Sequence, residues 1–145
     1  MSGDSPDAGR LADFVRERIG PFDGDLALRR IEGGQSNPTW IVDVDGRSRW
    51  VLRAKPTGVL LPSAHAIERE FRVMQALEGT PVPVPRARVL CDDPQVLGSA
   101  FYLMDFVEGR ILGDQTLPGL SVEERRAIYD DINRVIVELH RVDAA

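Results

Sequence analysis

Arg53 and Lys55 are two positive charges whose positions suit the binding of a phosphorylated ligand. They lie two residues apart near the end of a run of strand-forming residues, so their side chains point to the same face of the predicted strand. Cations in that place can hold phosphate oxygens. Charged residues at a strand end are more often solvated surface groups, unless a buried carboxylate lies opposite to orient them. A phosphate site here therefore requires a carboxylate that faces Arg53.

Glu70 is the candidate for that carboxylate. It lies in a helix predicted over residues 63–77, and at 100° per residue it falls inside the apolar arc of that helix. The apolar arc consists of Ile67, Phe71, Met74 and Leu77. An unpaired carboxylate on a core-facing face costs on the order of several kcal/mol, so Glu70 needs a cationic partner, for which Arg53 is the candidate. Helical geometry alone leaves a surface position for Glu70 open.

The segment Gly33-Gly34-Gln35-Ser36-Asn37 is a candidate phosphate-binding loop between two predicted strands. Two adjacent glycines let the backbone turn sharply and approach a ligand closely, so that its N–H groups can lie over phosphate oxygens. The same residue types also form ordinary hairpin loops, and the segment matches neither the P-loop nor the dinucleotide fingerprint. An ordinary turn therefore stays open as the alternative.

The elements that must position these residues are predicted from apolar periodicity and turn residues. Predicted helices cover residues 10–19, 63–77 and 122–142, the first covering an edge of the sheet and the last opening with a Ser121–Glu124 capping box. Predicted strands cover residues 26–31, 39–44, 49–55, 88–91 and 100–107, with a tight hairpin at Asp45-Gly46 and a turn at Asp92-Asp93-Pro94. Short connections favour antiparallel pairing, which predicts an α+β fold.

Composition limits the classes of partner. The 145 residues are 43% hydrophobic, enough for one ordinary core. A formal net charge of -5 gives no overall attraction to nucleic acid or to an anionic membrane, so neither is expected as a partner. Cys91 is the single cysteine, expected as a small buried hydrophobe. Residues 1–10 contain no apolar run, so no signal peptide is expected and a cytoplasmic location is predicted.

The order of these features resembles the amino-terminal lobe of the protein-kinase-like fold: a glycine-rich loop between the first two strands, a cation on the third, and a glutamate on the following helix. The sequence is similar to the aminoglycoside phosphotransferase family in Gly-Gly-Gln-Ser-Asn (33–37), Trp-Val-Leu-Arg (50–53), Arg-Glu-Phe (69–71), Val-Pro-Val-Pro (82–85) and Leu-His-Arg-Val-Asp (139–143). Within that family it is most similar to phosphotransferase-like domains associated with acyl-CoA dehydrogenases, through segments 53–56, 60–65 and 101–104.

The resemblance implies an ATP site. The 33–37 loop would cover the phosphates, Arg53 would occupy the place of the phosphate-binding Lys with Lys55 sharing its role, and the backbone after the last strand would meet the adenine edge. The residues implied are Gly33, Gly34, Ser36, Asn37, Arg53, Lys55, Glu70, Asp105 and Val107. Arg in place of Lys departs from the general kinase pattern, because a guanidinium is a broad fork and an ammonium is a point charge.

The resemblance also implies that the chain has two parts with different roles. Residues 1–107 would be the ATP-binding lobe, a five-stranded antiparallel sheet with one packed helix, and residues 108–145 the linker and first helix of a helical lobe. The family's catalytic His-Gly-Asp and its Mg²⁺ ligands do not occur in the chain, whose only histidines, His65 and His140, are expected to be structural. We therefore expect no catalytic or metal-binding residue and no turnover by this chain, with the acceptor, a small hydroxylated molecule, bound beyond Ala145.

One alternative function is a non-catalytic interaction module. In that case the kinase-like half would associate with itself or with another protein through the surface that a second lobe would cover. The helix at 122–142 would then expose an apolar stripe.

Overall fold

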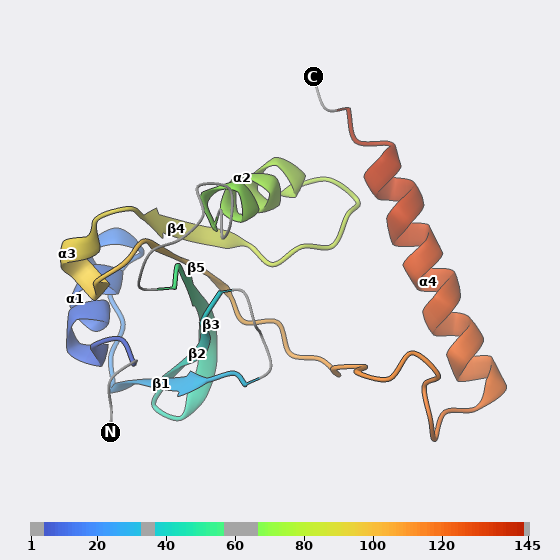
Figure 1. Cartoon of the computed structure of the whole chain (residues 1–145), viewed down its shortest axis with the longest axis horizontal. Coiled ribbons are helices and arrows are strands. Elements are labelled where there is room, and N and C mark those ends of the chain that lie inside the picture. Colours follow the sequence, from blue (N-terminus) through green and yellow to red (C-terminus); the bar gives the residue numbers. More distant parts are fainter. Residues whose placement is uncertain (1–4, 33–36, 57–66, 144–145) are drawn as a thin grey trace. The chain divides into compact units, whose positions relative to one another are not determined.

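The computed structural model describes residues 5–32, 37–56 and 67–143 (Figure 1). These residues form α1 (Ala8–Arg18), β1 (Leu26–Arg30), β2 (Thr39–Val44), β3 (Arg47–Ala54), α2 (Ile67–Leu77), β4 (Ala87–Cys91), α3 (Pro94–Leu97), β5 (Phe101–Asp105) and α4 (Val122–His140). The chain divides into two compact units, one of residues 1–76 and 85–106 and the other of residues 77–84 and 107–145. The predicted α+β class is confirmed.

The described strands form one five-stranded sheet in the order β1-β2-β3-β5-β4, with every neighbouring pair antiparallel. The five predicted strands and their pairing sense are therefore confirmed. The last strand, β5, lies inside the sheet, between β3 and β4. The connection through α2 therefore joins β3 to β4, two strands that are not neighbours in the sheet.

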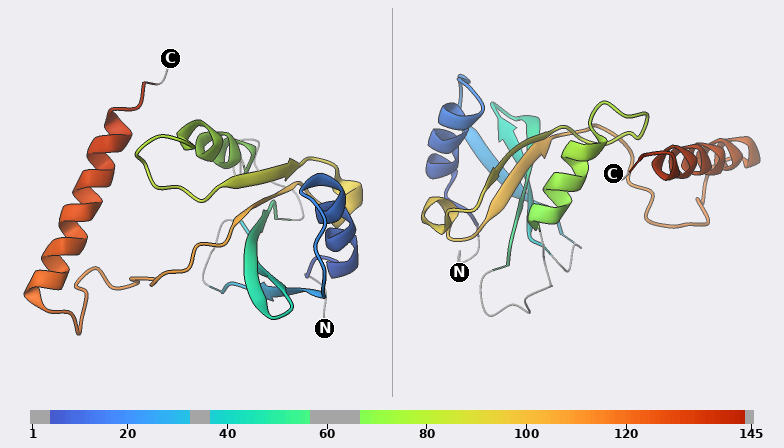
Figure 2. Two further views of the ribbon diagram at one scale, coloured as in Figure 1. Left: turned by 180° about the vertical axis from the view of Figure 1, so that it is seen from behind. Right: turned by 90° about the horizontal axis from the view of Figure 1, so that it is seen from above.

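Alternation along β3 and β5 gives the sheet two apolar faces. On one face Leu52, Phe101 and Leu103 are fully buried in a core that α1 completes. On the other face Tyr102 packs in a smaller cluster with α2. Figure 2 shows α1 and α2 on opposite sides of the sheet. Because side chains alternate along a strand, adjacent residues of β5 serve two different cores.

Helix α1 contributes more than the edge cover that its sequence predicts. Leu11 and Val15 have no exposed surface and belong to the larger core, and Phe14 packs edge-on against Phe101 with 5.2 Å between ring centroids. Asp7 caps this helix by accepting a hydrogen bond from the backbone N–H of Arg10. The short amphipathic helix is thus a full layer of the fold.

The tight hairpin predicted at Asp45-Gly46 joins β2 to β3. Asp45 has φ 49° and Gly46 has φ 72°, the pair of positive angles that a two-residue type I′ turn requires. The Asp45 carboxylate also accepts a hydrogen bond of 2.9 Å from the backbone N–H of Asp25, one residue before β1. The turn therefore fastens the start of the neighbouring strand as well as its own hairpin.

The segment after β4 is a short helix, so the turn predicted at Asp92-Asp93-Pro94 is wrong in type. Asp93 is the N-cap of α3, its carboxylate accepting a 2.8 Å hydrogen bond from the backbone N–H of Gln95. Pro94 occupies the first helical position, where its missing N–H costs nothing, and Gly98 ends the helix at φ 87°. The Asp-Pro pair therefore begins one helical turn here.

The second unit contains α4, whose predicted capping box is confirmed. The backbone N–H of Glu124 donates to the Ser121 hydroxyl at 3.1 Å, and the backbone N–H of Ser121 donates to the Glu124 carboxylate at 2.8 Å. The Tyr129 hydroxyl donates to the carbonyl of Gln115 at 2.7 Å. None of the described helices combines the length and apolar character that a membrane crossing needs.

Two glycine substitutions separate backbone strain from side-chain contact at the hairpin. We expect Gly46→Ala to lower the free energy of unfolding by about 1 kcal/mol, because φ is positive but a Cβ there would meet no atom within 4 Å. Gly24→Ala should cost about 2–3 kcal/mol, because its Cβ would also collide with the Asp45 carboxylate and break the bond to Asp25. Urea unfolding of both variants measures the difference. Equal losses would show that the Asp45 contact adds nothing.

Candidate functional site

The ion pair expected between Arg53 and Glu70 is present. Nε of Arg53 lies 2.7 Å from Oε2 of Glu70, and Nη2 of Arg53 lies 3.3 Å from Oε1, so guanidinium and carboxylate meet as two forks. The two side chains are 29% and 37% exposed. Strand β3 and helix α2 are therefore joined by a two-point, charge-assisted contact at the margin of the smaller core.

The Glu70 carboxylate has two further donors. Nδ2 of Asn37 donates to Oε1 at 3.1 Å, and the Tyr102 hydroxyl donates to Oε2 at 3.0 Å. A carboxylate has about four acceptor positions, two on each oxygen. Each oxygen of Glu70 thus accepts one bond from Arg53 and one from a neutral side chain. Glu70 is the centre of a network that we call the Glu70 cluster: Asn37, Thr39, Arg53, Glu70 and Tyr102.

Tyr102 and Thr39 were not predicted as site residues. They flank Arg53 in the sheet, because Thr39 of β2 and Tyr102 of β5 are the cross-strand partners of Arg53. The Thr39 hydroxyl accepts from Nη1 of Arg53 at 3.3 Å and donates to the backbone carbonyl of Asn37 at 3.0 Å. The signal that would find both residues is the strand register, which the sequence does not state.

The Tyr102 phenol is held in its neutral, donating form. Burial raises its pKa, the negative charge of Glu70 and the hydrogen bond to it raise the pKa further, and the charge of Arg53 opposes them. Its ring packs against Phe71 of α2 with 5.8 Å between centroids. Tyr102 therefore remains a donor to Glu70 at physiological pH.

Asn37 has a buried side chain, only 2% of the residue being exposed. Its amide points to Glu70, inside the fold. Gly33, Gly34 and Ser36, predicted with Asn37 as phosphate-binding residues, lie outside the described residues, as does His65. Contact of this segment with a nucleotide stays a prediction.

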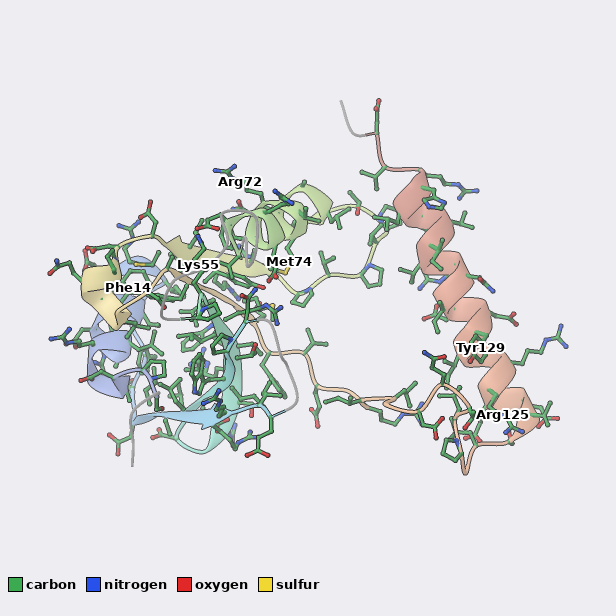
Figure 3. The ribbon with its side chains drawn as sticks, in the orientation of Figure 1. Phe14, Lys55, Arg72, Met74, Arg125 and Tyr129 are labelled. Carbon is green, nitrogen blue, oxygen red and sulfur yellow. The ribbon has the colours of Figure 1, made fainter. Side chains whose placement is uncertain are left out.

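Lys55 does not share the carboxylate of Glu70. Its Nζ lies 2.5 Å from Oε1 of Glu68, which is two residues before Glu70 on α2. Burial raises the pKa of the Glu68 carboxyl, but the hydrogen bond from Lys55, a backbone hydrogen bond and the charges of Lys55 and Arg72 together hold the pKa below its usual range. In Figure 3, Lys55 and Met74 lie on the sheet side of α2, whereas Arg72 projects from the other side. The two cations therefore make separate ion pairs with one helix.

The predicted adenine-contacting segment begins at the end of β5. The Asp105 carboxylate forms a two-point ion pair with Arg88, at 2.6 and 2.8 Å, and its backbone N–H donates to the carbonyl of Arg86 at 2.9 Å. The backbone N–H of Phe106 donates to the carbonyl of Arg49. Val107 is 64% exposed and belongs to the second unit. The backbone N–H groups of residues 105 and 106 are thus used within the first unit.

Two remaining expectations concern histidine and metal. His140 is the last residue of α4, in the second unit. In the described parts of the chain, no three acidic, histidine or cysteine side chains come together as metal ligands.

Two glutamates of α2 give a matched test of the Glu70 cluster. Glu70→Gln keeps the shape but replaces one acceptor oxygen by a donor, which leaves at least one of four donors facing it unpaired. We expect it to lower the free energy of unfolding by about 2 kcal/mol. Glu68→Gln removes a single partly exposed pair with Lys55 and should cost less than about 1 kcal/mol. Urea unfolding compares them, and a larger loss for Glu68→Gln would contradict the central place of Glu70.

Comparison with known proteins agrees with this geometry. The model of the phosphotransferase enzyme family matches residues 27–145. A Ralstonia eutropha crystal structure described as an aminoglycoside phosphotransferase superposes with a TM-score of 0.78 at 47% sequence identity, over 96% of this chain and 39% of that chain.

Curated relatives carry the name of a different enzyme. Mouse acyl-CoA dehydrogenase family member 10 is 49% identical over 120 residues, which are 83% of this chain and 11% of that protein. Human acyl-CoA dehydrogenase family member 11 is 39% identical over 141 residues, 94% of this chain and 18% of that protein. The chain thus spans less than a fifth of each of these relatives, and the predicted similarity to acyl-CoA dehydrogenase-associated domains is confirmed. With its family model covering most of the sequence, the chain belongs to the phosphotransferase enzyme family.

Proposed function

We propose that the first unit binds ATP, as the nucleotide-binding portion of a small-molecule phosphotransferase. The observation that carries the proposal is a pair of adjacent rows on the α2 side of the sheet, one apolar and one polar. Each row crosses β2, β3 and β5 in register. The two rows together suit a ligand with a flat apolar part and an anionic part.

The apolar row consists of Ile41, Val51 and Met104, which are cross-strand partners. Neighbouring strands lie about 4.8 Å apart, so the row spans about 10 Å, which is wide enough to cover one face of a purine. Val51, at its centre, is 9% exposed, and its two neighbours are half-buried. This row is the proposed adenine contact.

The polar row consists of Thr39, Arg53 and Tyr102, each two residues away from the apolar row on its own strand and hence about 7 Å away on the same face. Arg53 has five N–H groups, of which three donate within the Glu70 cluster: one each from Nε, Nη1 and Nη2. Among the described residues this leaves one N–H on Nη1 and one on Nη2 for phosphate oxygens. Arg53 is the proposed phosphate contact.

The cluster suits an arginine better than a lysine. Glu70 receives Nε and Nη2 of one planar group, while Thr39 receives Nη1 from its third corner. An ammonium group is a compact point charge and cannot reach three acceptors with this planar geometry. The replacement of the usual kinase lysine is thus matched by the surrounding side chains, which supports retention of phosphate binding.

The remaining parts of the reaction are proposed for the whole protein. Mg²⁺ would neutralise the charge of the ATP phosphates, and the resemblance implies that its ligands, the catalytic carboxylate and the site for a small hydroxylated acceptor lie outside this chain. The resemblance further implies that the backbone after β5, including Val107, meets the adenine edge, and this contact stays a prediction.

Titration of Mg²⁺–ATP by calorimetry tests the proposal. We expect saturable binding to the chain, weakened about tenfold or more by Arg53→Ala because a charge-assisted phosphate contact is lost. Arg53→Lys should also weaken binding, although lysine is the usual kinase residue, because Lys cannot make the fork with Glu70. Arg47→Lys, an exposed change at the start of the same strand, is the control. No binding to the parent chain, or equal affinity in Arg53→Ala, would refute the proposal.

A second candidate function, self-association, rests on α4. Six of its apolar side chains are 44–67% exposed: Val122, Tyr129, Ile132, Ile136, Val137 and Leu139. If this stripe pairs two copies, sedimentation equilibrium will show a dimer that Ile132→Lys dissociates. Ala127→Lys adds the same charge off the stripe and should leave the dimer intact. A monomeric parent chain at all concentrations would rule this function out.

A further inference from the structure

The Glu70 cluster has more parts than an ion pair needs. Arg53 and Glu70 alone make a two-point contact of 2.7 and 3.3 Å. The cluster adds one neutral donor to each carboxylate oxygen, Asn37 on Oε1 and Tyr102 on Oε2. These donors come from two different segments: Asn37 lies two residues before β2, and Tyr102 is the second residue of β5. Because each oxygen receives one added donor, the two added bonds act on the orientation of the carboxylate plane.

The orientation of Glu70 decides the orientation of Arg53. In a fork–fork contact the guanidinium and the carboxylate share one plane. A carboxylate bound only by Arg53 can turn about its last side-chain bond and take the guanidinium with it, because that torsion has a broad energy minimum. Donors fixed on both oxygens prevent the turn. They thereby fix the direction in which the free N–H groups of Arg53 point.

Both added donors are themselves held in place. Asn37 is 2% exposed, and its backbone carbonyl accepts from the Thr39 hydroxyl. Tyr102 is 3% exposed, its ring packs against Phe71, and its hydroxyl stays protonated because burial raises the pKa of the phenol. Rigid, buried donors of this kind are suited to positioning a neighbour rather than to touching a ligand.

We propose that Tyr102 and Asn37 are positioning residues that aim the Arg53 guanidinium at the nucleotide phosphates by fixing the plane of the Glu70 carboxylate. The inference rests on the proposed ATP site for its function and assigns a place to two side chains that never meet the ligand. It also changes the role predicted for Asn37, whose side chain would act through Glu70 and Arg53.

Tyr102→Phe is the main test variant, because it deletes one hydroxyl and keeps the ring that packs on α2. Tyr129→Phe is the matched control, since the Tyr129 hydroxyl bonds the carbonyl of Gln115 in the other unit. We expect Tyr102→Phe to weaken Mg²⁺–ATP binding about tenfold in calorimetry, the loss of one bond to a charged group. Adenosine, which lacks phosphates, should bind equally to the parent, to Tyr102→Phe and to Tyr129→Phe.

A double variant separates positioning from general stability. If Tyr102 acts through Arg53, Tyr102→Phe will cause no further loss of ATP affinity in an Arg53→Ala chain. Asn37→Ser should behave like Tyr102→Phe in both backgrounds. Equal weakening of ATP and adenosine, or the same tenfold loss with Arg53 absent, would overturn the inference.

A readout without nucleotide keeps the inference apart from the proposed function. The Nε–H proton of Arg53, identified by its loss in Arg53→Lys, reports the Glu70 contact through its exchange rate with water in NMR spectra. We expect faster exchange in Tyr102→Phe and an unchanged rate in Tyr129→Phe. If the parent chain binds no ATP, the proposed function fails, while faster exchange still supports positioning through Glu70. An unchanged rate in Tyr102→Phe overturns the positioning role in either case.

Discussion

A carboxylate on the inner face of a helix must find donors on the sheet beneath it, and the first unit is arranged around that requirement. Glu70 lies among the apolar residues of α2, where an unpaired charge would be costly. Arg53 and Tyr102, which are cross-strand partners in the sheet, donate to it, and so does Asn37, two residues before β2. Apolar contacts hold α2 against the sheet, but they are not directional and do not fix its position. The four hydrogen bonds to Glu70 fix where along the sheet α2 lies.

The same strands serve two purposes because their side chains alternate. In β3, Leu52 fills the larger core while Val51 and Arg53 face the α2 side. In β5, Leu103 belongs to the larger core while Tyr102 faces α2. A polar cluster and an apolar row can therefore lie side by side above a continuous core. A shift of one residue in the pairing of β3 with β5 would send Arg53 into that core, so core packing also protects the site.

The sequence predicts the parts of the structure that local periodicity determines, but not the contacts between segments that are distant in the chain. The α+β class, the five antiparallel strands, the Asp45 hairpin and the capping box of α4 follow from local patterns and are confirmed. The Arg53–Glu70 pair was found because a charge inside an apolar arc needs a partner. Thr39 and Tyr102 were missed because they join the cluster through strand register, and no local pattern states which residues of β2, β3 and β5 lie opposite one another. The helix α3 was missed because Asp-Pro pairs begin both turns and helices.

The position of β5 inside the sheet has a consequence for how this unit is made. A ribosome releases β1, β2 and β3 in order, and their hairpin connections allow them to pair at once. The strand that carries Phe101, Leu103 and Tyr102, and with them both cores, is released only after α2 and β4. Until then one side of β3 lacks its neighbour, and α2 lacks its closest aromatic contact. The nascent chain therefore presents an open strand edge and two incomplete apolar surfaces from the release of β3 until the release of β5, the period in which a holding chaperone would bind it.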